Sequence, residues 1–203
     1  MAGWTRHQGL AVGLPFENID TDQLIPARFM SAPRSEGYGK FLLHDLRHDA
    51  DGAMITDFPL NDPAAAGASI LVARRNFGGG SSREAAVYAL VDGGFRVVIA
   101  PSFGDIFAGN AVNNGLLPAR VGEADAEKLL KRIPGDLAVD LDRCTITAGN
   151  DVIPFEIDPV WRTKLINGWD DIDLTRAHAR EIDDFIVARR AAQPWLWPRN
   201  IET

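Results

Sequence analysis

The chain of 203 residues is predicted to form an α/β domain with a central, partly parallel sheet flanked by helices. The first observation is an apolar, β-branched run at 69–73, followed by a glycine turn, a helix-forming stretch and a second predicted buried strand at 95–100. A strand, a helix and a strand so close together form a βαβ unit with parallel strands. The second observation is a set of short segments that predict antiparallel strands, at 137–141, 145–148 and 152–157.

The other elements follow from apolar periodicity and turn residues. A strand is expected at 8–14, where Pro15 ends it. A short helix is expected at 40–47, between loops at 30–39 and 50–67 that are rich in proline, glycine and polar residues. The remaining predictions are helices at 103–114, 123–132, 159–168 and 175–190 and a strand at 116–121.

The composition excludes several classes of protein. A net charge of −7 disfavours nucleic acid as a partner, and no stretch is apolar enough to cross a membrane. The single cysteine, Cys144, excludes an internal disulfide, and also an iron–sulfur cluster or cysteine-rich zinc site held by this chain alone. Its own environment favours a small buried hydrophobe over a reactive thiol. Because no apolar leader precedes the first strand, a cytoplasmic location is expected.

We expect residues 1–203 to form a single domain, with the C-terminal helix and tryptophan-rich tail at 175–203 as an appendage. Two tryptophans of the tail, Trp195 and Trp197, leave two interpretations open. If they are exposed, they form a surface for a partner, and if they fold onto the domain, they clip the tail in place. The residues at helical spacing in the preceding helix are Ile182, Phe185, Ile186 and Arg189.

The glycine turn between the strand at 69–73 and the following helix is the main candidate site. Gly78, Gly79 and Gly80 permit a sharp turn, and Ser81 or Ser82 is expected at the N-cap of the helix. Free backbone N–H groups at a helix N-terminus, together with the guanidinium of Arg83, suit a small carboxylate or phosphate. An anion site and a purely structural cap are equally compatible with this spacing. The motif is not a Walker A loop, because no Gly-Lys-Ser/Thr follows the glycines, and it is not a Rossmann fingerprint, because its glycines are contiguous.

Two further groups of polar residues have metal-ligand spacing. Asn18, Asp20 and Asp22 would suit a hard cation, but their residue types favour a tight turn whose side chains bond their own backbone. His44 and His48 are four residues apart, and without a third ligand on the same element they are more typical of a polar surface. No metal ligand is therefore assigned to this chain.

Several motifs together resemble the small subunits of 3-isopropylmalate dehydratase, which correspond to the swivelling domain of aconitase. The strongest matches are Asn-Ile-Asp-Thr-Asp-Gln-Leu-Ile-Pro at 18–26 and Asn-Phe-Gly-Gly-Gly-Ser-Ser-Arg-Glu at 76–84. The resemblance runs from about Thr5 to about Gln193. Other matching stretches are 37–39, 44–47, 97–103, 105–110 and 113–118.

The resemblance implies an aconitase-like swivelling β/β/α domain and a hydro-lyase. The family removes water from a hydroxy di- or tricarboxylate and adds it back, and the dehydratase isomerises 2-isopropylmalate and 3-isopropylmalate in leucine biosynthesis. It implies that this chain is active only with a large subunit, as a heterodimer or larger assembly. Three cysteines of that large subunit are expected to hold a [4Fe–4S] cluster, with no cofactor on this chain. Neither nucleic acid nor membrane is expected as a partner.

The resemblance also assigns roles to individual residues. Ser81 would be the general base that takes a proton beside a carboxylate. The residues that would bind substrate are Gly80, Ser82, Arg83, Arg28 and Arg34. The last of these lies in a loop where the family distinguishes the substituent on the malate skeleton.

This sequence departs from the usual family motif. Glu36 adds an acid to the loop where related enzymes tend to carry basic residues, and Ala85 replaces a histidine next to the turn. These changes leave open another alkyl-substituted malate, such as citramalate or dimethylmalate, or a catalytically altered paralogue. A metabolite-binding module unrelated to dehydration is a third possibility. The other replacements are Gly79 for cysteine, Val87 for proline and Tyr88 for tryptophan.

Overall fold

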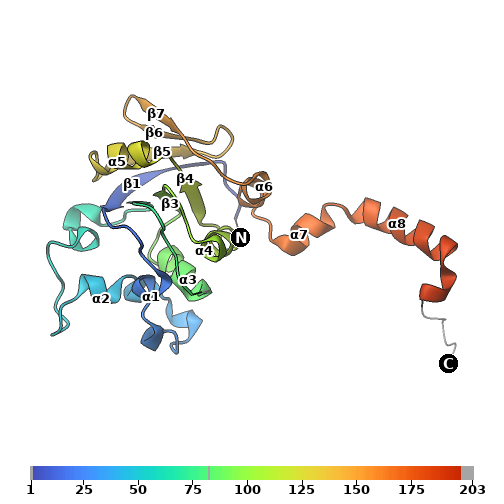
Figure 1. Ribbon diagram of the computed structural model, residues 1–203, viewed down its shortest axis with the longest axis horizontal. Coiled ribbons are helices and arrows are strands. Elements are labelled where there is room, and N and C mark those ends of the chain that lie inside the picture. Colours follow the sequence, from blue (N-terminus) through green and yellow to red (C-terminus); the bar gives the residue numbers. More distant parts are fainter. Residues whose placement is uncertain (1, 82, 198–203) are drawn as a thin grey trace.

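The computed structural model describes residues 2–81 and 83–197, and these form a seven-stranded mixed sheet with helices on both faces (Figure 1). The strand order is β4-β3-β2-β1-β5-β6-β7. The first four strands run parallel and the last three join antiparallel, as the sequence predicts. The strands are β1 (Arg6–Leu14), β2 (Ile70–Ala73), β3 (Val97–Ala100), β4 (Leu117–Arg120), β5 (Gly135–Asp140), β6 (Thr145–Ala148) and β7 (Asp151–Pro154).

The first two α-helices are single turns, and the later ones span six to fourteen residues. Short 3-10 segments lie at Ala27–Phe29, Arg34–Glu36, Gly39–Phe41, Pro59–Asn61, Pro63–Ala65 and Pro194–Leu196. The α-helices are α1 (Thr21–Leu24), α2 (His44–Arg47), α3 (Glu84–Asp92), α4 (Asp105–Asn113), α5 (Glu123–Leu130), α6 (Pro159–Asn167), α7 (Asp171–Arg176) and α8 (Ala179–Ala192).

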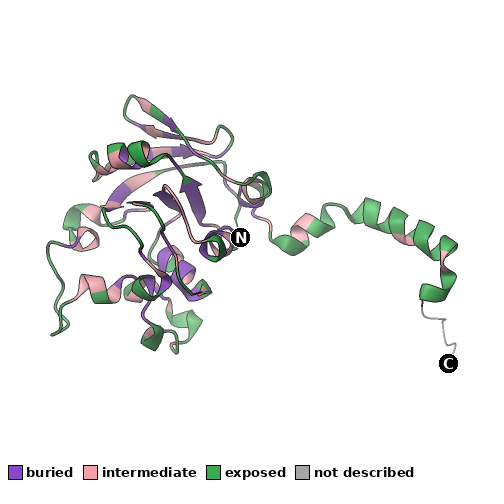
Figure 2. Cartoon of the chain, in the orientation of Figure 1, coloured by how far each residue is buried: buried purple, intermediate pink, exposed green. Residues whose placement is uncertain are grey.

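Successive side chains of the parallel strands enter two separate cores, one on each face of the sheet. Leu71 of β2 packs in one core with Leu90 of α3, and Ile70 and Val72 pack in the other with Leu129 of α5. Every residue of β2 and β3 is buried, as expected for parallel strands covered on both faces. The purple centre and green rim of Figure 2 show this arrangement. This arrangement explains why residues 70–73 and 97–100 are apolar without interruption.

Helix α3 begins later than the sequence predicts. Arg83 is its N-cap, with an extended backbone, and α3 starts at Glu84 rather than directly after Ser81. Arg83 makes no side-chain capping bond. The prediction of a serine cap is therefore wrong for Ser81, whose carbonyl accepts a hydrogen bond from Thr21 of a distant segment. Ser82 lies outside the described residues.

Two predicted helices are broken. The helix expected at 40–47 is a 3-10 segment and the one-turn α2, separated where Leu43 takes a left-handed backbone with φ of 52°. The helix expected at 175–190 is the end of α7 and most of α8. His178 between them has a non-helical backbone, and Thr175 donates its hydroxyl to the Asp171 carbonyl, a bond that often bends or ends helices.

The C-terminal arm, residues 171–197, extends away from the body of the molecule (Figure 1). Trp195 in this arm is 74% exposed, so it is not folded onto the domain. Of the two interpretations left open by the sequence, the exposed one holds for Trp195, whereas Trp197 is partly covered and lies against Arg190 of the same arm. Within the described residues, no helix combines the length and apolar character needed to cross a membrane.

Candidate functional site

Three loops meet at the carboxyl ends of the parallel strands. The residues after β1 pair with the glycine turn after β2 through a bridge between Asp20 and Gly79. The same glycine turn also pairs with the loop after β3, through a bridge between Phe77 and Phe103. Ligands of open α/β sheets bind at this edge, outside the carboxyl ends of the strands. The glycine turn is thus held between two other loops at the position where such a fold places a ligand.

Backbone bonds from the loop after β1 fix the shape of the glycine turn. The N–H of Gly78 donates to the Ile19 carbonyl at 2.7 Å, and the N–H of Thr21 donates to the Gly79 carbonyl at 3.0 Å. The Thr21 hydroxyl, in a residue only 2% exposed, donates to the Ser81 carbonyl at 2.8 Å. Thr21 therefore fixes the backbone on both sides of Gly80.

The polar cluster at 18–22 is a turn, as its residue types favour. Asp20 caps α1 and shares a capping box with Gln23. Asn18 has a left-handed backbone with φ of 58°, and its Oδ1 accepts a hydrogen bond from Nδ2 of Asn76 at 2.8 Å. In the part of the chain that the structure describes, no group of three His, Cys, Asp or Glu side chains is arranged to hold a metal ion. Only Asp20 of the three bonds the neighbouring backbone as predicted, because Asn18 bonds Asn76 and Asp22 pairs with Arg83.

Gly80, Ser81 and Arg83 lie together at the N-terminal end of α3. Gly80 has φ of 87°, which carries the chain through a left-handed turn, and Ser81 is exposed to solvent. The Arg83 guanidinium is largely covered and donates to the carboxylate of Asp22. The sequence predicts Asp22 only as part of a tight turn, and it predicts neither the bond from Thr21 to Ser81 nor the pair of Asp22 with Arg83. Each of these bonds joins residues that lie about sixty positions apart, so local spacing could not predict it.

Arg34 is placed at the other end of α3. It pairs with Asp92, the last residue of that helix, and its guanidinium lies 4.3 Å from the centre of the Tyr88 ring. The backbone N–H of Tyr38 donates to the same Asp92 carboxylate at 2.6 Å. Since α3 spans nine residues, about 13 Å of helix separates Asp92 from the Ser81 turn. The structure does not bring Arg34 and Arg83 together.

Arg28 makes a two-point contact with Asp45 of α2. One of the two bonds, from Nη1 to Oδ2, measures 2.8 Å, and the guanidinium also stacks on Phe29 at 4.5 Å. Arg28 lines an open cavity of about 420 Å³ together with His44 and His48, whose rings stack at 4.3 Å. The two histidines contact each other and the backbone, which fits the polar-surface interpretation.

The Arg28–Asp45 pair shifts the pKa of a carboxyl group, and this shift can be measured. Hydrogen bonds from Arg28 lower the pKa of Asp45 from its ordinary 3.8 to about 2. Arg28→Ala should return this pKa toward 3.8, as followed by NMR titration of the Asp45 carboxyl. Because the folded-state pKa is depressed, the pair stabilises the fold above pH 3.8, and this contribution is lost as the pH falls through about 2. An unchanged Asp45 pKa in the variant would show that the two-point contact is not populated in solution.

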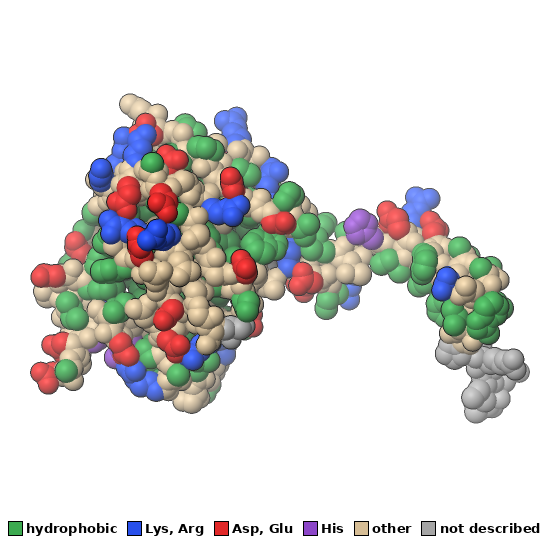
Figure 3. Space-filling model, viewed as in Figure 1, with side chains coloured by type: hydrophobic (Ala, Val, Ile, Leu, Met, Phe, Trp, Pro, Cys, Tyr) green, Lys and Arg blue, Asp and Glu red, His purple; other side chains and the backbone are tan. Residues whose placement is uncertain are grey.

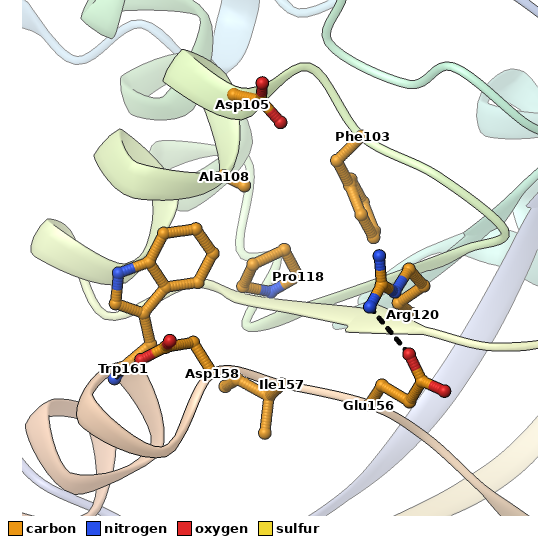
Figure 4. Close-up of a pocket in the computed structure, with 9 residues that line it drawn as sticks. All are labelled: Phe103, Asp105, Ala108, Pro118, Arg120, Glu156, Ile157, Asp158 and Trp161. Atoms are coloured by element: carbon orange, nitrogen blue, oxygen red, sulfur yellow. Dashed lines mark hydrogen bonds and ion pairs between the residues drawn. The ribbon is translucent and has the colours of Figure 1, made fainter.

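A cavity of about 400 Å³ lies between the loop after β3, β4 and α6 (Figure 4). Phe103, from the loop that pairs with the turn, and Trp161, from α6, line two of its walls. Arg120 of β4 crosses its edge and donates to Glu156 at 2.6 Å. The cavity thus lies between α6, the last helix of the body before the arm, and the loop that pairs with the glycine turn.

Comparisons with known proteins agree on one relationship. Residues 1–124 match the family model of the aconitase C-terminal domain. The chain is 46% identical over 200 residues to a protein of Caulobacter vibrioides named 3-isopropylmalate dehydratase small subunit, covering 97% of this chain and 99% of the relative. It is 47% identical over 179 residues to the protein of that name in Shouchella clausii, covering 87% of this chain and 91% of the relative.

A solved structure has the same fold. The crystal structure titled 3-isopropylmalate dehydratase, from Methanocaldococcus jannaschii, superposes with a TM-score of 0.64 at 24% identity. The superposition covers 88% of this chain and 98% of that one. The mixed sheet, with its glycine turn at the carboxyl edge, therefore defines a domain of the aconitase type. Given the identity to curated relatives over nearly its full length, the chain belongs to the family of 3-isopropylmalate dehydratase small subunits.

The departures from the family motif have clear positions in the structure. Ala85 is buried at the start of α3, where it packs in the core. Glu36 is exposed and lies 3.5 Å from the ammonium of Lys40, so its charge is partly balanced. Neither residue blocks the approach of an anion to the turn at Gly80 and Ser81.

Proposed function

We propose that this chain is the small subunit of a 3-isopropylmalate dehydratase, which acts in leucine biosynthesis together with a large subunit. The observation that carries the proposal is 46% identity along 97% of the chain to a relative of that name. The relationship favours isopropylmalate over citramalate or dimethylmalate as substrate. In this reaction a C–H and a C–OH bond break, an alkene forms and water leaves, and readdition of water to the other carbon completes the isomerisation.

We assign proton transfer to Ser81. Its hydroxyl oxygen takes the proton from the carbon beside a substrate carboxylate, and the electron pair of that C–H bond forms the alkene. A serine hydroxyl is a very weak acid, so its basic form requires nearby positive charge and hydrogen-bond donors. The N-terminal end of α3 and the Arg83 guanidinium supply both at this point in the chain.

We assign carboxylate binding to Arg83 and the backbone of the turn at Gly80. A guanidinium can hold a carboxylate by two parallel hydrogen bonds, and in this chain Asp22 occupies that position. A substrate carboxylate would replace the Asp22 carboxylate or share the guanidinium with it. Ser82 keeps its sequence-based assignment to substrate binding, as do Arg28 and Arg34, each of which has a carboxylate partner in this chain.

The expected [4Fe–4S] cluster belongs to the large subunit. This chain has one cysteine, Cys144, which is partly buried on the hairpin side of the sheet and donates to the Leu141 carbonyl. A single thiolate cannot hold such a cluster. When bound to three cysteines of the partner, the cluster supplies a Lewis acid for the departing hydroxyl.

The proposal is tested by mixing this chain anaerobically with its candidate large subunit. Alkene absorbance is followed with isopropylmalate, citramalate and dimethylmalate as alternative substrates. We expect turnover of isopropylmalate only when both subunits are present. Turnover of citramalate in preference would replace the proposed substrate, and no turnover with an intact cluster would favour a catalytically altered paralogue.

Arg83→Lys should lower kcat/KM for isopropylmalate by about 30-fold, chiefly through a higher KM. Lysine keeps the positive charge but loses the planar two-point contact, and a loss of about 2 kcal/mol corresponds to this factor. Steady-state kinetics of the reconstituted pair provides the measurement. Arg74→Lys serves as the control, because Arg74 pairs with Glu127 away from the turn and should leave kcat/KM unchanged. Wild-type kinetics in Arg83→Lys would remove Arg83 from the proposed site.

A further inference from the structure

The arm leaves the body from a fixed point. The Lys164 side chain of α6 is only 4% exposed, and its ammonium donates to Asp171, the first residue of α7, at 2.7 Å. It also donates to Asn113 at the end of α4. Asp170 and Asp173 form a capping box that starts α7. These contacts fix where the arm begins and its direction at the root.

Beyond this root the arm has almost no packing of its own. All 14 residues of α8 are described, and none of them is buried (Figure 2). Isolated helices of this length are marginal in water, because most helical stability in proteins comes from packing of an apolar face. The helix is therefore expected to gain its stability from a surface outside this chain.

One face of α8 carries the apolar side chains that such a contact needs. Ile182, Phe185 and Ile186 follow the i, i+3, i+4 spacing that places them in one stripe, and Phe185 is 64% exposed. Trp195 and Leu196 extend the apolar surface beyond the end of the helix, and both are exposed. Figure 3 shows apolar side chains collected along one edge and the tip of the arm. Exposed apolar surface rich in aromatic residues is typical of protein interfaces.

The arm begins beside the face that a catalytic partner must cover. Helix α6 ends at the arm and contributes Trp161 to the cavity of about 400 Å³. The same cavity is lined by Phe103, which pairs with Phe77 of the glycine turn. A large subunit that closes over Ser81 therefore lies next to the cavity and the root of the arm. A second copy of this chain would cover the arm but would leave the Ser81 turn without its catalytic partner.

We propose that the arm is a clasp that holds the large subunit, with the stripe of Ile182, Phe185 and Ile186 packed on that partner. This inference rests on the proposed function, since it takes the large subunit as the occupant. The alignment to the Caulobacter vibrioides small subunit covers 97% of this chain, so it includes most of the arm. The Caulobacter vibrioides protein therefore shares most of the arm, and its name, small subunit, implies a larger partner.

The test compares two acidic substitutions on opposite faces of α8. Phe185→Asp places a charge in the stripe, and Val187→Asp makes the same kind of change on the other face, where Val187 is 70% exposed. Binding of each purified full-length variant to the purified large subunit is measured by sedimentation velocity. We expect Phe185→Asp to raise Kd by about 30-fold or more, as for an interface hot spot, and Val187→Asp to raise it less than about 3-fold.

Further readouts separate a contact from a folding defect and from a failed function. Circular dichroism and thermal unfolding should match the wild type, and saturating large subunit should restore wild-type kcat in Phe185→Asp. A wild-type Kd for Phe185→Asp would overturn the clasp even if the pair is active. Self-association of this chain that Phe185→Asp abolishes, with unchanged binding to the large subunit, would assign the arm to a second copy instead. Normal binding without turnover in the wild-type pair would contradict the proposed function and leave the clasp intact.

Discussion

Ser81→Ala should lower kcat of the reconstituted dehydratase by about 1,000-fold, because it removes the group assigned to take the substrate proton. The turn itself should survive, since Thr21 holds the carbonyl of Ser81 rather than its side chain. Alanine also tolerates the backbone of residue 81, whose φ is not in the left-handed region. The loss should therefore fall on kcat, with little change in KM.

Two controls make this result specific to proton transfer. The Ser81→Ala chain should bind the large subunit with wild-type Kd, and the iron content and spectrum of the cluster should be unchanged. Alkene formation is then compared at equal concentrations of assembled enzyme. A kcat within about 10-fold of the wild type would remove Ser81 from the role of base.

Gly78→Ala should destabilise the folded chain by about 3 kcal/mol or more. Gly78 has φ of 71°, which costs a side-chain-bearing residue about 1 kcal/mol or more. An added Cβ would also lie 2.6 Å from ring carbons of Phe107, which is buried in the core under the turn. Overpacking of this kind costs about 1–3 kcal/mol, and it adds to the backbone strain. The free energy of unfolding in urea provides the measurement.

Gly109→Ala is the matched control for this substitution. Gly109 lies within α4, and a Cβ there would meet no atom within 4 Å. Alanine should therefore stabilise the helix by about 0.5–1 kcal/mol, through its higher helix propensity. If Gly78→Ala cost less than about 1 kcal/mol, the close approach of the glycine turn to Phe107 would not exist in solution.

The sheet was largely predictable because its signals are local. Residues 70–73 and 97–100 are apolar on both faces, and such runs are characteristic of strands covered by helices on each side. The hairpin of β6 and β7 could be predicted equally well, since Gly149 supplies the positive φ that its turn requires. In each case the information lies within about ten residues.

The start of α3 and the surroundings of the turn depend on distant residues. Serines after a glycine run have a high propensity to cap a helix. In this chain, however, the Ser81 carbonyl accepts a hydrogen bond from the Thr21 hydroxyl. Likewise, Asp22 pairs with Arg83, and Asp92 pairs with Arg34. These partners lie about sixty positions apart in the sequence, so no local pattern identifies them.

The arm shows a different limit of prediction from sequence: its helix is predicted by local residues, but the surface that covers the helix is not. The stripe at Ile182, Phe185 and Ile186 correctly predicts a helix, and periodicity alone also predicts that this face is covered. In the described chain Ile182 and Phe185 are exposed and Ile186 is only partly covered, because the body of the domain provides no surface for this face. Amphipathic spacing indicates that a partner exists without saying whether it lies in the same chain.

The central claim is that the turn on this chain removes the substrate proton while a partner subunit completes the site. Deuterium incorporation tests it most directly. The assembled enzyme is incubated in D₂O with the alkene intermediate, and NMR follows deuterium at the carbon beside the carboxylate as isopropylmalate forms by addition of water. We predict incorporation at the rate of hydration by the wild-type pair, and none by either subunit alone or by a Ser81→Ala pair with an intact cluster. Incorporation by the Ser81→Ala pair at the wild-type rate would contradict the account.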